Sequence, residues 1–270
     1  MLRNMLPIAL LLLSAAPLSA ASPSFDCRTA ATGREMAVCA DGNLAAADRD
    51  LAVAWQSLLA RLDTETATAL RADQKKFLQA LDEGFDSDVW GKAGPPPQKD
   101  MRAQIARLPH DGDDSPFPAL EDELRERIGF LRALTPAASG APFAGLWKNY
   151  DAELLVEPAS EGRYDVTFGL TSYGFDRDHC HFNATFAAAE AGLAAAAVHN
   201  TDPEQDNHDI AGRLRIARAG AMLTLTQADP DQAPGAGERW VCPRVPALTG
   251  PLFHTGLKAD DASRLQPDEE

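Results

Sequence analysis

Residues 135–142 read TPAASGAP, and they separate two halves of the sequence that have different hydrophobic periods. The stretch consists of small residues and two prolines, a composition typical of a flexible connection between domains. Before it, apolar residues recur every three or four positions, and after it they alternate with polar ones. This change of period predicts a helical domain over residues 22–134, a linker over 135–143 and an antiparallel β domain over 144–257.

The first half is expected to form a small bundle of helices. Thr32 and Glu35 have the spacing of a capping box, which predicts the start of a short helix. Asn43 is expected to cap a second helix, and a third begins near Thr64. The apolar stripes of the longer helices are Leu44, Leu51, Trp55, Leu58 and Leu62, then Leu70, Gln74, Phe77, Leu81 and Phe85, and finally Leu120, Leu124, Ile128, Leu131 and Leu134, with residues 101–108 as a further short candidate.

The second half is expected to form an antiparallel β-sandwich or a small β-barrel. Between Tyr164 and Leu170 apolar residues alternate with polar ones, which is the period of a half-buried strand. Residues 180–186 repeat this alternation, and short strands separated by glycine, proline and aspartate turns are typical of both architectures. Further strand candidates are residues 146–150, 153–156, 192–198, 214–218, 223–225 and 239–242, and the acidic tail over 258–270 is expected to be disordered.

The first 21 residues have the layout of a secretory signal peptide. Arg3 precedes an apolar run over residues 6–13, which is followed by small residues up to Ala21. The run is well short of the roughly 20 residues that a membrane-spanning helix needs. Phe25 and Asp26, just before the first cysteine, do not suit a lipoprotein cleavage site. We therefore expect a soluble exported protein, periplasmic in location, with no stable membrane insertion.

Four cysteines are present, namely Cys27, Cys39, Cys180 and Cys242. An even number of cysteines in an exported protein predicts disulfides. Three pairings are possible, and the local one joins Cys27 to Cys39 and Cys180 to Cys242, so that each bridge stays within one half of the chain.

The charge of the chain excludes some classes of partner. Lys and Arg number 25 against 40 Asp and Glu, which gives a formal net charge of -15. Nucleic-acid binding requires cationic side chains that displace counterions from phosphates, and an anionic lipid surface would repel this chain. The acid excess favours a basic partner instead.

Two acidic loops are the candidate contact surfaces for such a partner. The second loop alternates oxygen donors as calcium loops do, but Asn207 and Arg213 stand where an EF-hand needs Gly and Glu. We therefore expect both loops to be solvated surfaces without an ion. Their carboxylates are Asp111, Asp113 and Asp114 in the first loop, and Asp202, Glu204, Asp206 and Asp209 in the second.

No constellation of residues predicts catalysis, a metal site or a cofactor. His179 and His181 flank Cys180, but alternation along a strand places the cysteine on the opposite face, and a bridged cysteine offers zinc no thiolate. No serine lies in a Gly-x-Ser-x-Gly turn, and no glycine-rich phosphate loop follows a strand. Trp147 and Trp240 are expected to pack in the core or at its rim rather than to line a sugar groove. We therefore expect a protein that is not an enzyme.

One segment resembles a known family. Ser24-Phe25-Asp26-Cys27, followed by Glu35, Cys39, Leu44 and Asp48, resembles the start of the LprI-like lysozyme inhibitors, which are small exported helical modules of bacteria. Gln74, Phe77 and Leu78 are similar to the Gln-x-x-Trp-Leu segment of that family, and Arg127, Ile128 and Leu131 to its closing Arg-Ile-x-x-Leu segment. The resemblance covers residues 25–134.

The sequence also departs from the family pattern. Phe77 replaces the usual Trp, no second cysteine pair lies between Cys39 and Cys180, and residues 94–118 contain an insertion rich in proline and aspartate. The β domain resembles no family that we identify.

Our leading hypothesis is an exported non-enzymatic binding protein that blocks a lysozyme, or another basic protein, with an acidic loop. The resemblance implies the inhibitory role, and the charge of the chain is consistent with it. One alternative is an envelope module that binds a ligand or another periplasmic protein without any effect on lysozyme. A more distant alternative is a cell-wall hydrolase.

Overall fold

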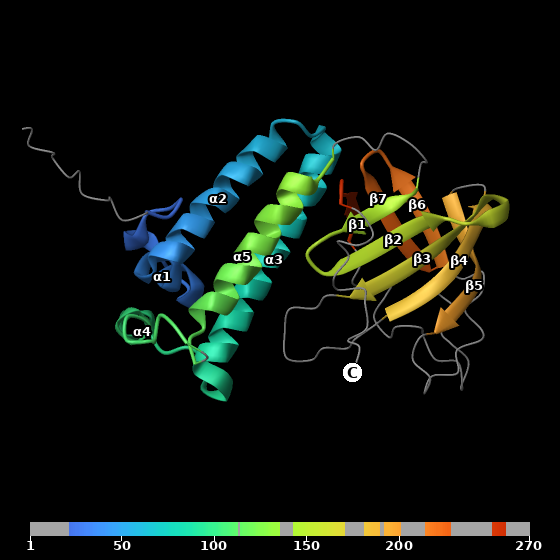
Figure 1. Cartoon of the computed structure of the whole chain (residues 1–270). Coiled ribbons are helices and arrows are strands. Elements are labelled where there is room, and N and C mark those ends of the chain that lie inside the picture. The colour runs from blue at the N-terminus through green and yellow to red at the C-terminus, as the bar shows by residue number, and fades with distance from the viewer. Residues whose placement is uncertain are drawn as a thin grey trace, which may run out of the picture.

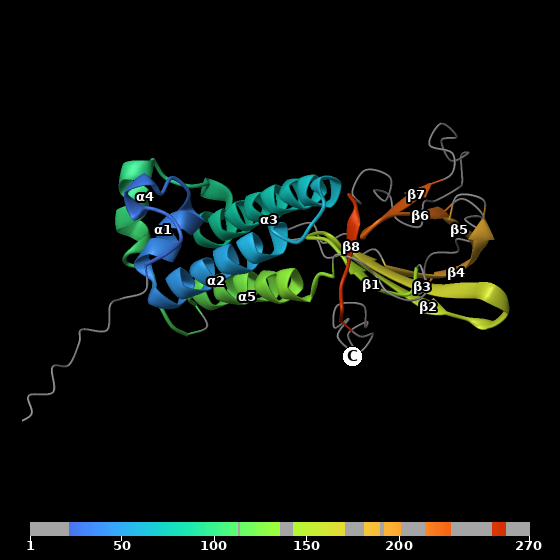
Figure 2. The same cartoon turned by 90° about the horizontal axis from the view of Figure 1, so that it is seen from above.

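The computed structural model describes residues 22–112, 114–135, 143–170, 181–189, 192–200, 214–227 and 250–257. It consists of a helical bundle followed by an eight-stranded antiparallel barrel that packs against one end of the bundle (Figures 1 and 2). The predicted order of helices before strands is confirmed, and the barrel is one of the two architectures expected. Among the described residues, no helix has the length and apolar character that crossing a membrane requires.

Five α-helices form the bundle, and local capping explains where the first ones begin. The capping box is confirmed, because the Thr32 hydroxyl accepts from the Glu35 amide at 3.2 Å and the Glu35 carboxylate accepts from the Thr32 amide. The prediction that Asn43 caps the second helix is wrong. Asp41 caps it, because its carboxylate accepts from the amides of Asn43 and Leu44. The helices are α1 (Gly33–Ala40), α2 (Gly42–Leu59), α3 (Thr64–Trp90), α4 (Gln98–Ile105) and α5 (Phe117–Ala133), with short 3-10 turns at Cys27–Thr29 and Gly91–Ala93. A third 3-10 turn, Ser160–Gly162, connects two strands of the barrel.

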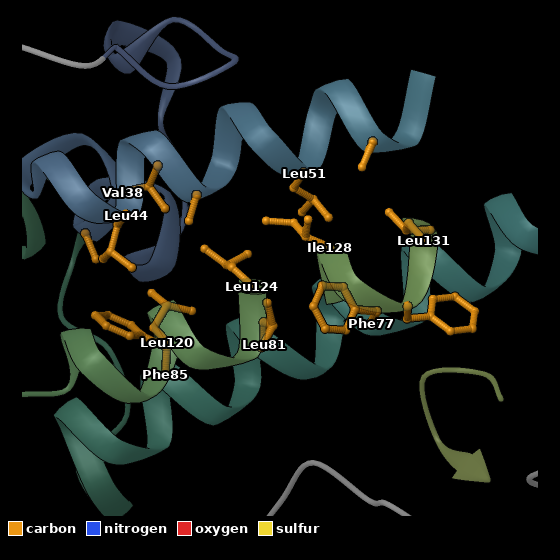
Figure 3. Close-up of a cluster of buried hydrophobic side chains, with 14 of the residues drawn as sticks. Val38, Leu44, Leu51, Phe77, Leu81, Phe85, Leu120, Leu124, Ile128 and Leu131 are labelled. Carbon is orange, nitrogen blue, oxygen red and sulfur yellow. The ribbon is translucent and has the colours of Figure 1, made fainter. Parts of the chain in front are cut away.

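The predicted apolar stripes meet in the bundle core (Figure 3). Side chains of α2 and α5 face each other along most of the length of these helices, and α3 covers the opposite side of the same core. Trp55 and Leu62 are only partly buried at its edge. The buried residues include Val38, Leu44, Leu51, Leu58, Leu70, Phe77, Leu81, Phe85, Leu120, Leu124, Ile128 and Leu131.

A disulfide joins Cys27 to Cys39 with a Cα–Cα distance of 5.7 Å, as the local pairing predicted. It ties the segment before α1 to the end of α1. The pair Cys180 and Cys242 lies outside the described residues, and its bridge remains a prediction.

Removing this bridge is expected to destabilise the protein. The two cysteines are 12 positions apart, and the loop-entropy model gives about 3 kcal/mol for a loop of this size. Replacing both Cys27 and Cys39 with serine should lower the free energy of unfolding by that amount in urea titrations. A double variant as stable as the parent would contradict the expectation.

The eight strands follow one another around the barrel in chain order. Seven of them coincide with predicted strands, and the candidate over residues 239–242 lies outside the described residues. The eighth was not predicted, because three residues are too few to show a period. The strands are β1 (Gly145–Lys148), β2 (Ala152–Pro158), β3 (Arg163–Leu170), β4 (His181–Ala189), β5 (Gly192–Asn200), β6 (Leu214–Ala219), β7 (Met222–Gln227) and β8 (Leu252–His254), and pairing of β8 with β1 closes the ring.

Buried apolar side chains fill the barrel interior. Phe168 and Phe182, directly opposite each other on β3 and β4, stack with ring centroids 5.0 Å apart. At Gly192 the chain passes so close to β6 that an added Cβ would lie 2.0 Å from the carbonyl oxygen of Ile216, and its φ of 137° also favours glycine. The interior is therefore a packed core, as in other small barrels.

The barrel and the bundle are joined through the last strand as well as through the chain connection. Thr255 forms a β-bridge with Leu134, and the Gly256 amide donates to the Ala133 carbonyl at 2.8 Å. Met222 and Phe253, which belong to β7 and β8, are buried in the core cluster of the helices. The barrel thus completes the hydrophobic core of the bundle.

Candidate functional site

The end of the bundle farthest from the barrel brings together the disulfide, α1, α4 and the loop over residues 106–116 (Figures 1 and 2). We call this region the distal end. The side chain of Arg102 on α4 donates to the carbonyl of Cys27 at 2.9 Å, and that of Gln98 donates to the carbonyl of Ala30. These contacts fix α4 on the segment that the disulfide holds.

The acidic loop of the distal end is anchored at both of its ends. Nδ1 of His110 lies 3.0 Å from Oδ2 of Asp41, and its ring packs on Phe117 with centroids 4.9 Å apart. The amide of Ser115 donates to the carbonyl of Gly112, which has a φ of 94°. The loop is therefore held against the start of α2 and the start of α5.

Burial would raise the pKa of Asp41, but hydrogen bonds from His110 and from the amides of Leu44 and Asn43 outweigh it. The pKa therefore lies below the usual value for Asp, and the carboxylate stays ionised. An ionised Asp41 keeps its hydrogen bond to His110 at neutral pH.

Asp111 and Asp114 are both exposed on this loop. Within the described part of the chain, neither carboxylate has an ion-pair partner among the salt bridges. The loop therefore presents negative charge to solvent on a fixed base. Asp113 of this loop, and Asp202, Glu204, Asp206 and Asp209 of the second predicted loop, lie outside the described residues.

The last turns of α3 add further negative charge near the distal end. Asp82, Glu83, Asp86 and Asp88 lie there, and no basic residue lies in the last turn. This arrangement opposes the helix dipole, which favours cations at a C-terminus. Among the ion pairs of the described residues, one involves these four acids: the buried Arg34 donates to Asp82 at 2.8 Å.

The Asp86 side chain lies beside Trp90, whose indole N–H donates to it at 3.2 Å. Burial and the neighbouring charge of Asp82 raise the pKa of Asp86, although the indole hydrogen bond lowers it. The end of α3 thus carries acidic side chains, one of which, Asp86, is partly buried.

Trp147 and His254 both have structural contacts in the described part of the chain. Trp147 is fully buried and its indole N–H donates to the Phe143 carbonyl at 2.8 Å, so it lines no groove. His254 shares a hydrogen bond with the Thr135 hydroxyl at 2.7 Å. Among the described residues no group of three or more metal-ligating side chains comes together. His179, Cys180, Trp240 and Cys242 lie outside the described residues, as do the side chains of His181 and His199.

A second polar cluster, at the junction of bundle and barrel, was not predicted. Arg127 on α5 donates to Asp73 at 2.6 Å and to Gln74 at 2.8 Å, both on α3. Its guanidinium also contacts the rings of Phe77 and Phe130, at 4.9 Å and 4.6 Å from their centroids. Only 3% of the Arg127 side chain and 7% of the Asp73 side chain are exposed, so the pair is buried.

The turn between β1 and β2 completes this cluster. The amide of Tyr150 donates to the second oxygen of Asp73 at 3.0 Å, which links the barrel to the buried ion pair. Burial, together with the charges of Asp151, Asp73 and Glu83, raises the pKa of Tyr150 to about 12. The Tyr150 phenol therefore stays protonated at neutral pH.

One sequence signal indicates Arg127 in retrospect. It lies three positions after Leu124 and four before Leu131, so helical geometry places it on the buried stripe. A cation on such a stripe requires a buried anion. The sequence does not indicate which of the acidic residues that anion is, because Asp73 lies 54 positions away.

Residues 27–106 match the family model described as lysozyme inhibitor LprI. The match runs from the first disulfide cysteine to the residue after α4, and it confirms the resemblance over this region. The rest of the chain, including α5 and the barrel, lies outside the match. No curated protein and no solved structure shows a significant match to the chain.

Proposed function

We propose that this protein is an exported, non-enzymatic binding protein that inhibits a lysozyme. The observation that carries the proposal is the match of residues 27–106 to the lysozyme inhibitor family. On this proposal, residues 1–21 are removed during export and the folded chain acts in the periplasm.

The charge of the chain supports a basic partner. The net charge is -15, and animal-type lysozymes are strongly basic. Opposite net charges accelerate encounter at low ionic strength, while the close contacts at the interface set the lifetime of the complex. Electrostatic steering thus accounts for fast association. A surface complementary in shape to the lysozyme is also needed to block its glycan-binding cleft.

The distal end is the surface that we assign to this contact. Its loop is exposed, carries Asp111 and Asp114, and is fixed at its base by His110. A preorganised loop loses little conformational entropy on binding, so more of its interaction energy contributes to affinity. The region also adjoins the disulfide segment within the family match. Residues 202–209 are a second acidic loop proposed for the same partner.

We expect the purified protein, at micromolar excess, to slow the digestion of bacterial cell walls by lysozyme at physiological salt. The association rate should fall steeply as salt is raised from about 20 to 300 mM, because salt screens the steering. Replacing both Asp111 and Asp114 with asparagine should weaken inhibition about two- to tenfold.

A matched control removes the same number of charges elsewhere. Glu157 and Asp165 are exposed acidic residues of the barrel, so Glu157→Gln with Asp165→Asn should leave inhibition nearly unchanged at physiological salt. An equal loss in both double variants would assign the effect to net charge alone and would remove the distal end from the proposal. No inhibition by the parent protein would refute the function itself.

A further inference from the structure

The turn over residues 149–151 brings the barrel into contact with α3. The backbone of this turn contacts the helix through the hydrogen bond from the Tyr150 amide to Asp73. The side chain of Asn149 accepts from the amides of Asp151 and Ala152 at 2.8 and 2.7 Å, which fixes the shape of the turn. The position of Asp151 relative to α3 is thereby determined.

Asp151 is buried at this point, and one oxygen of its carboxylate has no hydrogen-bond donor among the residues that the structure describes. Only 6% of the residue is exposed, and the oxygen concerned is Oδ2. Lys76 on α3 is the cation that acts on it, and Asp73 on the same helix is an opposing anion. A buried carboxylate that has an oxygen without a hydrogen-bond donor is costly to ionise.

The other charged groups of the junction form ion pairs or a cation–π contact with neighbouring side chains. From α5, Arg127 is paired with Asp73, and Glu126 lies 3.8 Å from the ammonium of Lys148. Lys148 of β1 also pairs with the buried Glu153 of β2. The Lys76 ammonium lies 5.8 Å from the ring centroid of Tyr150. Asp151 takes part in none of these ion pairs.

We propose that Asp151 makes the junction sensitive to protons: the barrel docks tightly on α3 when Asp151 carries a proton and loosens when this side chain ionises. The proposal concerns the contact between the two halves and holds whether or not the protein binds a lysozyme. The physical basis is hydration of the Asp151 carboxylate. When the turn separates from α3, which we call opening, water reaches the carboxylate, so opening is favoured whenever the carboxylate is charged.

The direction and size of the effect follow from the proton affinities of the two states. Burial, opposed by Lys76 and reinforced by Asp73, raises the pKa of Asp151 to about 6, whereas a hydrated Asp has its ordinary value of 3.8. The docked state therefore holds its proton up to a higher pH than the open state. The contribution of Asp151 to docking is greatest at low pH and is lost as the pH rises through about 6. The equilibrium constant for opening should rise roughly tenfold between pH 5 and pH 7, and it should rise little above pH 7.

His254 of β8, which contacts Thr135 at the end of the bundle, titrates with the opposite consequence. Burial lowers its pKa, and so does Arg218, although a hydrogen bond with Ala144 raises it. Acidification thus favours the open state at His254 and the docked state at Asp151. A test must separate these two groups, and comparison of variants with the parent at each pH does so.

Hydrogen exchange of the Tyr150 amide in the full-length mature protein is a direct measure of opening. The opening constant would be obtained at pH 5, 6, 7 and 8 after correction for the intrinsic exchange rate. The ratio of the parent to Asp151→Asn cancels the contribution of His254. We expect this ratio to rise about tenfold from pH 5 to pH 7. Glu157→Gln, which removes an exposed acid from β2, the strand that follows the turn, should give no such trend.

A second variant separates a proton switch from a merely structural role. Lys76→Gln removes the cation that favours ionised Asp151, so the rise in opening should move to higher pH. A constant ratio between parent and Asp151→Asn, or an unchanged midpoint in Lys76→Gln, would overturn the proposal.

Discussion

Replacing Arg127 with methionine is expected to lower the free energy of unfolding by about 3–5 kcal/mol. The change leaves Asp73 buried without its cation, while the hydrogen bond from the Tyr150 amide remains. It also removes the guanidinium from its contacts with Phe77 and Phe130. Urea or guanidinium titration of the full chain measures the loss.

Two further variants test the cause. Arg125→Met breaks an exposed pair with Glu121 on the same helix and should cost at most about 1 kcal/mol. Adding Asp73→Asn to Arg127→Met removes the stranded charge while keeping an acceptor for Tyr150, so it should recover much of the loss. If the double variant were no more stable than Arg127→Met, the stranded carboxylate would not be the reason for the instability.

Phe253→Ala is expected to cost about 3–5 kcal/mol, the range for a buried aromatic side chain. The residue is fully buried, and although it belongs to β8 it packs in the helical core, with its ring centroid 6.4 Å from that of Phe130. The substitution should therefore weaken the helices as well as the barrel. Far-ultraviolet circular dichroism at 222 nm follows the helices, and near-ultraviolet signals follow tertiary packing.

Leu252→Ala is the matched control for this experiment. Leu252 is equally buried but faces the barrel interior. If bundle and barrel unfold as one unit, both substitutions will lower the midpoint of the helical signal. If the two halves unfold separately, Leu252→Ala will leave the helical midpoint unchanged, and the shared core described above will not be cooperative.

The sequence predicted the elements whose cause is local. The spacing of Thr32 and Glu35 specifies a cap within four residues, and the stripes of α2, α3 and α5 follow from periodicity alone. The cap of α2 was misassigned because both Asp41 and Asn43 are good caps, and only the backbone shows that Asp41 is extended while Asn43 is helical.

The features that depend on distant pairing were not predicted. Closure of the barrel uses β8, whose three residues carry no readable pattern, and its partner β1 lies more than 100 positions earlier. The junction cluster depends on the meeting of Asp73, Arg127 and Tyr150 from three separate elements. By contrast, the exposure of Asp111 and Asp114 follows from the polar, glycine-containing loop in which they lie, and the sequence indicated that loop.

The position of Phe253 near the end of the chain has a consequence for biosynthesis. A polypeptide made from its N-terminus contains every helix of the bundle long before the ribosome adds the residue that completes their core. Until then the helices have an uncovered apolar face, and a nascent chain in this condition gains less from compaction. The late position of β8 therefore delays completion of the bundle core until the seven strands before it have also been synthesised.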